Sequence, residues 1–427
     1  MGREWQHGSR SIAVGCLATL AVVAAAALCG CGNGTTVGGQ SNAGSSSPAP
    51  APSQHMTPAS SASPTARPPT TTPDASLTQR TNAARARAAL KAFDRAFYVT
   101  PGPLAYWAVD TTGGQATFYR QAEMIEMVED AYESSGDPAY KRMIVALQRG
   151  IVAYFGRSWL SRPYNDDIMW MVIASLRAYE LTGDGQYLRM AQHNFDATYA
   201  RSWSSDLGGG LWWTIYRAEK NVTTNAPAAI AACKLAAALH DSSYLTKARL
   251  LYKWVRTHLY DAQTGAVYDS LRPTGSGVAY RNRKVGLTYN QGSFIGAADL
   301  LYQATGRQSY DSDALHTLEF TRASLTHRGI LPGEAGGPDS NGGGFKGIFC
   351  RWAVKFTRDN HISSFDGWFQ QNADAAWSHR DARGLMGTKW RAPTSSGLLY
   401  AWDCSSAVVL LQVLSARQAR GLSAGRR

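Results

Sequence analysis

The sequence has few cysteines outside its first 31 residues. Three of the six lie in that stretch, and the others are Cys233, Cys350 and Cys404. Three is an odd number, and their separations do not match the paired spacing of a structural zinc site. Cys233 lies in an alanine-rich segment typical of a buried, inert thiol. Whether Cys350 and Cys404 form a disulfide stays open, because sequence alone cannot establish the geometry of a bridge.

Motifs for several other chemistries are also missing. The chain has no HExxH, no paired CxxC and no EF-hand spacing, and its nine histidines are dispersed. Its two glycine-rich stretches lack the spacing of a phosphate-binding loop. The order of residues also indicates no Ser/His/Asp arrangement. These absences disfavour metalloproteases, nucleotide-binding enzymes and serine hydrolases, and we expect neither a metal nor a cofactor.

Charge is sparse and unbalanced. Charged residues make up 17% of the chain, and 43 Lys and Arg against 31 Asp and Glu give a formal net charge of +12. Such a balance favours anionic partners. However, the cations are scattered, apart from a small cluster in residues 416–427, and form no stripe typical of a nucleic-acid interface. We expect weak attraction to anionic surfaces and no nucleic-acid partner.

The first 31 residues predict export. Arg3 and Arg10 precede an apolar stretch that ends in small residues, as in a signal sequence. The segment "LCGC" resembles a bacterial lipobox, in which Cys31 would receive lipid and become the mature N-terminus. Several acyl chains anchor a protein far better than one. The sequence thus predicts a membrane-anchored surface lipoprotein, with ordinary secretion or a retained spanning helix as alternatives.

Residues 32–75 are too poor in apolar side chains to form a core. The segment is rich in Ser, Pro, Thr and Ala, and Arg67 is the only charged residue between positions 32 and 73. This composition is typical of a disordered linker. We therefore predict a folded domain at residues 76–418, tethered by the linker and followed by a basic tail at 419–427.

The folded part predicts helical hairpins. Four segments end a helix at Gly, Asp or Ser and place a tyrosine early in the next helix: Tyr140, Tyr187, Tyr244 and Tyr310. Helix, short polar turn and helix again is the pattern of stacked αα-hairpins. The separation between these tyrosines grows along the chain, so the repeat is loose. An all-α toroid of helical pairs fits this pattern better than a strict solenoid.

Two adjacent carboxylates, Asp166 and Asp167, precede an apolar run. Asn165 can cap a helix here, which would place both acids in its first turn. Acids are common at that position because they complement the helix dipole. The following segment, residues 168–181, is apolar on nearly every face and predicts an inner helix. The acids would then lie at the end of the toroid, in a cleft.

This arrangement suits cleavage of a glycosidic bond. Adjacent side chains on a helix diverge by about 100°, so the two acids can address opposite sides of one bound ring. Like charges in a confined site also push their pKa values apart. One ionised carboxylate and one protonated carboxyl is the pair that a retaining glycosidase uses.

The chain resembles glycoside hydrolase family 76 at these residues and beyond. "YNDDIMW", "GGGLWW", "KNVTTNAPAAIAACKLA", "LTYNQGSFIGAADLLYQATG" and "GFKGIFCRW" occur in the family's order, over about residues 84–413. The resemblance implies an (α/α)6 barrel and endo-acting, retaining hydrolysis of α-1,6-linked mannan. It also implies that Asp166 is the nucleophile and Asp167 the general acid/base.

Further residues are candidate sugar contacts. Indole faces and side-chain amides suit sugar rings and hydroxyls, although core packing, helix capping or a solvated charge explains each of them equally simply. The candidates are Asn165, Trp170, Trp212, Trp213, Asn221, Asn225, Tyr289, Asn290, Gln291 and Lys346. The expected partner of this monomer is an α-mannan polysaccharide or oligosaccharide. A cell-wall transglycosylase and a non-catalytic glycan-binding lipoprotein are the alternatives.

Overall fold

The computed structural model describes residues 75–274, 279–338 and 340–419. The predicted signal sequence, Cys31, the linker up to residue 74 and the tail from residue 420 lie outside the described residues. The predictions made for those segments therefore stay predictions.

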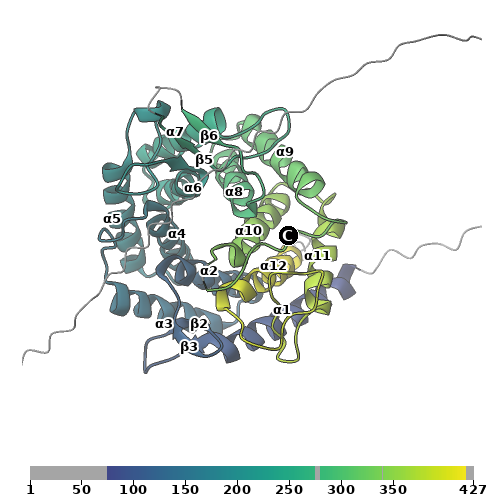
Figure 1. The fold of residues 1–427 in the computed structure, drawn as a ribbon. Helices are drawn as coiled ribbons and strands as arrows, with labels where there is room; N and C mark the ends of the chain where they lie inside the picture. The colour runs from purple at the N-terminus through teal and green to yellow at the C-terminus, as the bar shows by residue number, and fades with distance from the viewer. Residues whose placement is uncertain (1–74, 275–278, 339, 420–427) are drawn as a thin grey trace, which may run out of the picture. The chain divides into compact units, whose positions relative to one another are not determined.

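Twelve α-helices make up most of the described chain. Each inner helix contacts the next around a closed ring, α2–α4–α6–α8–α10–α12, and α12 returns to α2 (Figure 1). The odd-numbered helices pack outside this ring. The bounds are α1 Ala75–Phe97, α2 Phe118–Ser135, α3 Pro138–Phe155, α4 Asn165–Thr182, α5 Gly185–Ser202, α6 Val222–Leu239, α7 Ser242–His258, α8 Thr288–Thr305, α9 Gln308–Ser324, α10 Phe345–Asp359, α11 Asp366–Ser378 and α12 Ala401–Ala419. The predicted all-α, (α/α)6 barrel is confirmed.

The hairpin turns follow the predicted pattern. Each of the four tyrosines is the third residue of an outer helix: Tyr140 of α3, Tyr187 of α5, Tyr244 of α7 and Tyr310 of α9. The preceding inner helices end at residues in the left-handed conformation, three of them glycines and the fourth His240 at φ 54°. The N–H of each such residue donates to the carbonyl four residues earlier, which satisfies the end of the helix.

The outer helices return the chain, so the inner helices all begin at one end of the barrel, which we call the mouth. The positive ends of their backbone dipoles therefore converge there. Two three-stranded antiparallel sheets, which the sequence analysis did not predict, accompany the helices: β1 Tyr98–Val99, β2 Tyr106–Asp110 and β3 Gly113–Gln115; and β4 Lys220–Asn221, β5 Ser270–Arg272 and β6 Tyr280–Asn282. The second sheet lies at the mouth, because β4 runs directly into α6.

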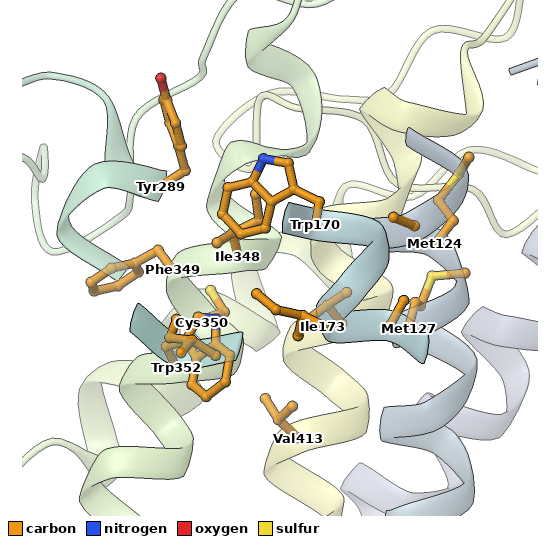
Figure 2. Close-up of a cluster of buried hydrophobic side chains, with 14 of the residues drawn as sticks. Met124, Met127, Trp170, Ile173, Tyr289, Ile348, Phe349, Cys350, Trp352 and Val413 are labelled. Carbon is orange, nitrogen blue, oxygen red and sulfur yellow. The ribbon is translucent and has the colours of Figure 1, made fainter. Parts of the chain in front are cut away.

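The inner helices bury an apolar core. Met124 and Met127 of α2, Trp170 and Ile173 of α4 and Ile348 of α10 lie in one cluster (Figure 2). Helix α6 is long and apolar enough to cross a membrane, but 72% of it is buried, as for a core helix. The three cysteines of the described chain are buried, free thiols, so Cys350 and Cys404 form no disulfide here.

Candidate active site

Asn165 fixes the start of α4 against the loop of residues 203–219. The helix begins at Asn165 itself, and the side chain does not cap it, so the predicted capping role is wrong. Instead, its Nδ2 donates to the Trp212 carbonyl at 2.8 Å and its Oδ1 accepts from Arg201 at 2.8 Å. Its backbone N–H donates to the Trp213 carbonyl. These bonds hold the Trp213 loop beside the first turn of α4.

Asp166 is half-buried in that first turn. Its Oδ2 accepts a hydrogen bond from the Thr223 hydroxyl of α6 at 3.4 Å, while its Oδ1 is buried without a partner. The Trp213 indole N–H lies close enough to lower the pKa of Asp166, but not at hydrogen-bond geometry. Burial, and then the charge of Asp167, raise the pKa of Asp166 well above its ordinary value. An unsatisfied, enclosed carboxylate oxygen of this kind is typical of a functional site.

Asp167 differs from Asp166 in having a cation, Arg162, close enough to affect its pKa. Burial raises its pKa to about 6, and the Arg162 guanidinium opposes this shift. Tyr119, at the start of α2, lies near the pair: burial raises its pKa to about 12, and both aspartates contribute. The Tyr119 hydroxyl donates to Oδ1 of Asn341 at 2.8 Å and accepts from Arg120 at 3.0 Å. Helix α2 thus supplies a polar wall on this side.

A third acid, Asp269, borders the site at the start of β5. It accepts from Nδ2 of Asn290 at 3.0 Å and from Nδ2 of Asn282 at 3.1 Å. Tyr289 lies near both acids: burial, then Asp269 and Asp166, raise its pKa well above the ordinary value. Its hydroxyl points away from the apolar cluster (Figure 2). The sequence analysis missed Asp269, Tyr119 and Thr223 as site residues. Thr223 lies in the quoted segment KNVTTNAPAAIAACKLA, but only contacts between distant segments bring the three together.

Several predicted sugar contacts instead brace the scaffold. The Trp212 indole N–H donates to the Ser204 hydroxyl at 2.9 Å, and the Lys220 ammonium lies 4.7 Å from its ring centroid. Asn221 caps α6 by accepting from the Thr224 N–H. Trp170, 3% exposed, packs in the core.

Three further polar candidates are also occupied by the protein. Asn225 bonds both backbone groups of Leu211, at 2.7 and 3.1 Å. Gln291 does the same with Val267, at 3.0 and 2.8 Å. The buried Lys346 ammonium donates to the Thr388 carbonyl at 2.7 Å. These side chains position the loops that surround the mouth.

The groups gathered at the mouth are therefore two adjacent acids, a third acid, and aromatic and amide side chains. Asn290 belongs to this set, since its Oδ1 is buried without a partner. Across the described part of the chain, no three His, Cys, Asp or Glu side chains cluster in a way that could hold a metal ion. The arrangement suits acid and base chemistry on a neutral, hydroxyl-rich ligand.

The model of glycosyl hydrolase family 76 matches residues 82–422. The chain belongs to this family. Its function as a glycoside hydrolase follows, and the resemblance noted in the sequence is confirmed. No curated protein sequence matches the chain.

Solved structures of the family agree with this assignment. The α-1,6-mannanase GH76A of Salegentibacter sp. HEL1_6 is 30% identical, with a TM-score of 0.72 over 79% of this chain and 99% of that one. It was solved as an inactive variant, with two consecutive aspartates replaced by asparagine, in complex with α-1,6-mannotriose. The family 76 mannosidase Bt3792 of Bacteroides thetaiotaomicron shares the fold at 20% identity, with a TM-score of 0.71 over 80% of this chain and 100% of that one. Dfg5 of Chaetomium thermophilum does so at 19% identity, with a TM-score of 0.66 over 80% of this chain and 91% of that one.

Proposed function

We propose that this glycoside hydrolase is a retaining, endo-acting α-1,6-mannanase. The observation that carries the proposal is the pair Asp166 and Asp167, half-buried in the first turn of α4 and without an ion-pair partner in the described chain. The mannanase of known structure that is 30% identical becomes inactive when two consecutive aspartates are replaced. This similarity supports the role of the pair and the choice of an α-1,6-linked mannan.

In the proposed reaction, a carboxylate oxygen of Asp166 attacks the anomeric carbon of the bound mannosyl unit. The bond to the departing oxygen breaks as Asp167 gives that oxygen its proton. The ionised Asp167 then takes a proton from water, whose oxygen displaces Asp166 from the glycosyl ester. Two inversions at the same carbon retain its configuration.

Both carboxyl groups of the ligand-free pair have raised pKa values. The pKa of Asp167 is raised to about 6, whereas burial and the second carboxylate raise that of Asp166 well above its ordinary value. The proposal requires that the pair hold one proton, on Asp167, when the substrate is bound. The Thr223 hydroxyl, the Trp213 indole N–H and the start of α4 are the groups that favour an ionised Asp166.

Product analysis on linear α-1,6-mannan tests the function. The purified domain should release a ladder of mannooligosaccharides whose first-formed reducing ends, followed by proton NMR, are α anomers. First-formed β anomers would overturn retention, and mannose as the sole early product would overturn endo action. Longer products formed with added acceptor sugars would favour the transglycosylase. Binding without any product would favour a glycan-binding protein.

We also propose that a lipid on Cys31 anchors the enzyme at the cell surface. The proposal depends on the signal-like stretch and on "LCGC". In a bacterial host, the wild-type chain should incorporate radiolabelled palmitate and sediment with membranes, and Cys31→Ala should do neither. Palmitate incorporation that persists in the variant would contradict the assignment.

A further inference from the structure

A second pocket lies on the β4–β5–β6 sheet, away from the groups that surround Asp166. Its cavity has a volume of about 490 Å³, and its walls include His258 of α7, Leu271 of β5 and Tyr280, Arg281 and Arg283 around β6. None of the residues that line it is acidic. The pocket therefore combines apolar walls with a concentration of positive charge.

The two arginines of this pocket lack carboxylate partners in the part of the chain that the structure describes. Each lies over the Tyr268 ring, with its guanidinium carbon 5.8 Å (Arg281) or 5.7 Å (Arg283) from the centroid. Nearby arginines behave differently, since Arg272 pairs with Glu219 and Arg256 with Asp313, both at 2.5 Å. The ring holds the two guanidinium groups in place and leaves their N–H donors free of a fixed anion.

Other charged groups near the pocket are already engaged. Asp261 accepts from the Tyr268 hydroxyl at 2.8 Å, and Asp206 accepts from the Ser204 hydroxyl at 2.9 Å. The pKa of His258 is lowered by burial and then by Arg281 and Lys220, which indicates a positive local potential. The pocket thus keeps a surplus of positive charge.

The strand β6 connects this pocket to the active site. Asn282 stands between Arg281 and Arg283, and its amide donates to Asp269 beside the catalytic pair. Both arginines line the pocket, while Asn282 between them contacts Asp269, so the pocket adjoins the mouth along this segment.

We propose that this pocket binds a phosphate ester carried by a mannosyl unit of the substrate. Two arginine forks match the oxygens of a phosphate group, and the volume exceeds that of inorganic phosphate alone. Tyr280, 57% exposed, supplies a ring face for the sugar. This inference rests on the proposed mannanase function and adds to it a preference for phosphorylated mannan.

Direct binding tests the pocket without catalysis. In calorimetric titrations at low salt, mannose 6-phosphate should bind the wild-type protein, while mannose should not produce the same signal. The double variant Arg281→Gln/Arg283→Gln should raise the dissociation constant at least tenfold. The matched control Arg249→Gln/Lys253→Gln removes the same charge from the exposed face of α7 and should leave it within twofold. Equal losses in both variants, or no binding to the wild type, would overturn the proposal.

Kinetics separate this inference from the proposed function. The Arg281→Gln/Arg283→Gln variant should lose at least fivefold in kcat/KM on phosphorylated α-1,6-mannan and less than twofold on neutral α-1,6-mannan. If neither polymer is cleaved by the wild type but mannose 6-phosphate still binds, the mannanase proposal fails and the pocket stands. If vesicles of phosphatidylglycerol bind through these arginines and mannose 6-phosphate does not, the ligand is a membrane surface and the sugar-phosphate proposal is wrong.

Discussion

Enclosed carboxylates occupy two regions of this barrel, the mouth and the interior. The interior set, which we call the inner ion-pair cluster, consists of Glu123, Glu126, Glu129 and Asp130 of α2 with Arg177 of α4 and Arg351 of α10. Arg177 lies eleven residues after Asp166 on the same helix, about 16 Å further along its axis. Both regions exclude water from acids, but they compensate the acids in different ways.

The inner ion-pair cluster contains its own cations, although both carboxylate oxygens of Glu129 and one of Glu123 have no hydrogen-bond partner. Arg177 bonds Glu126 at 3.0 Å and Asp130 at 2.7 Å, and Arg351 bonds Glu123 at 2.7 Å and Asp130 at 2.9 Å. Arg177 also lies 3.2 Å from Glu133, at the rim of the cluster. Burial raises the pKa of Glu123 to about 8 and that of Glu129 well above its ordinary value. These ion pairs tie three inner helices together.

The aspartates at the mouth have no such partners within the described chain. One oxygen of Asp166 has no hydrogen-bond partner. The Arg162 guanidinium lowers the pKa of Asp167 electrostatically but forms no ion pair with it. Raised pKa values occur in both regions and therefore do not identify the catalytic acids. The difference is the fixed cation, since an acid that the protein does not neutralise is available to a ligand.

The largest effect on activity should come from substituting Asp166. Asp166→Asn should lower kcat on α-1,6-mannan by about 10³-fold or more, because the covalent step is lost. It should also raise the free energy of unfolding at pH 7, because the folded state no longer holds a carboxyl with a raised pKa.

The matched substitution in the interior is Glu129→Gln, which should leave kcat within about threefold, since Glu129 lies inside the barrel and touches no substrate. Reducing-sugar assays and urea unfolding measure both quantities. An Asp166→Asn variant that keeps a tenth of the wild-type rate would remove Asp166 from the mechanism.

Removing a cation of the inner ion-pair cluster should lower stability and leave activity nearly unchanged. Arg177→Met leaves acids unpaired in the barrel and should lower the free energy of unfolding by about 3–5 kcal/mol. The half-exposed pair of Arg85 and Asp374 is the control, and Arg85→Met should lower it by less than about 1 kcal/mol. Urea titrations give the stabilities, and kcat should stay near wild type for the folded fraction. Equal losses in the two variants would show that burial is not what makes the cluster stabilising.

Local signals predicted much of this architecture. The tyrosine after each polar turn predicted the hairpins, because the turn and the third residue of the outer helix are set by neighbours in sequence. The adjacent pair Asp166 and Asp167 was equally visible, since the apolar run behind it predicts an inner helix. Such features need no knowledge of distant segments.

The remaining site residues depend on contacts between distant segments. Asp269 reaches the mouth only through the pairing of β5 with β4 and β6, and Tyr119 through the closure of the ring between α2 and α4. Asn225 and Gln291 were predicted to meet sugar, but their amides meet loop backbone. A side-chain amide satisfies either partner equally well, so its residue type does not reveal which one is present.

The dependence of kcat/KM on pH should report the titration of Asp166 and Asp167. The coupled pair loses its first proton near the pKa of Asp167, about 6, and its second at a higher pH. If the singly protonated pair is active, kcat/KM should rise about tenfold per pH unit below about 6 and fall again at higher pH. A profile flat from pH 4 to 8 would contradict a shared proton.

The same shifts fix the sign of the effect on stability. The folded protein holds these protons more tightly than the unfolded chain, whose aspartates ionise near pH 4. The stabilising contribution of the protonated pair is therefore complete below about pH 4 and declines as the pH rises through about 6. Urea unfolding of wild type and Asp167→Asn between pH 4 and 7 measures this contribution, which the variant should reduce.

The smallest expected effect on activity comes from an aromatic side chain at the mouth. Like the acids, the aromatic side chains occur both in the interior and at the mouth. Trp212 is buried and bonded, whereas Tyr216 is 76% exposed on the loop that Asn165 holds beside Asp166. An aromatic ring held there without packing partners suits stacking on a sugar that extends past the cleavage point. Tyr216→Ala should lower kcat/KM about threefold to tenfold on α-1,6-mannohexaose and less than about twofold on mannotriose, because the shorter chain does not reach the ring.

Tyr154→Ala is the control, since that tyrosine is 43% exposed on α3, outside the ring of inner helices. The control should leave both substrates unchanged. If Tyr216→Ala affected the two oligosaccharides equally, the ring would shape the loop rather than bind the chain. The division between interior groups with fixed partners and mouth groups without them would then hold for the acids, through their cations, but not for the aromatic side chains.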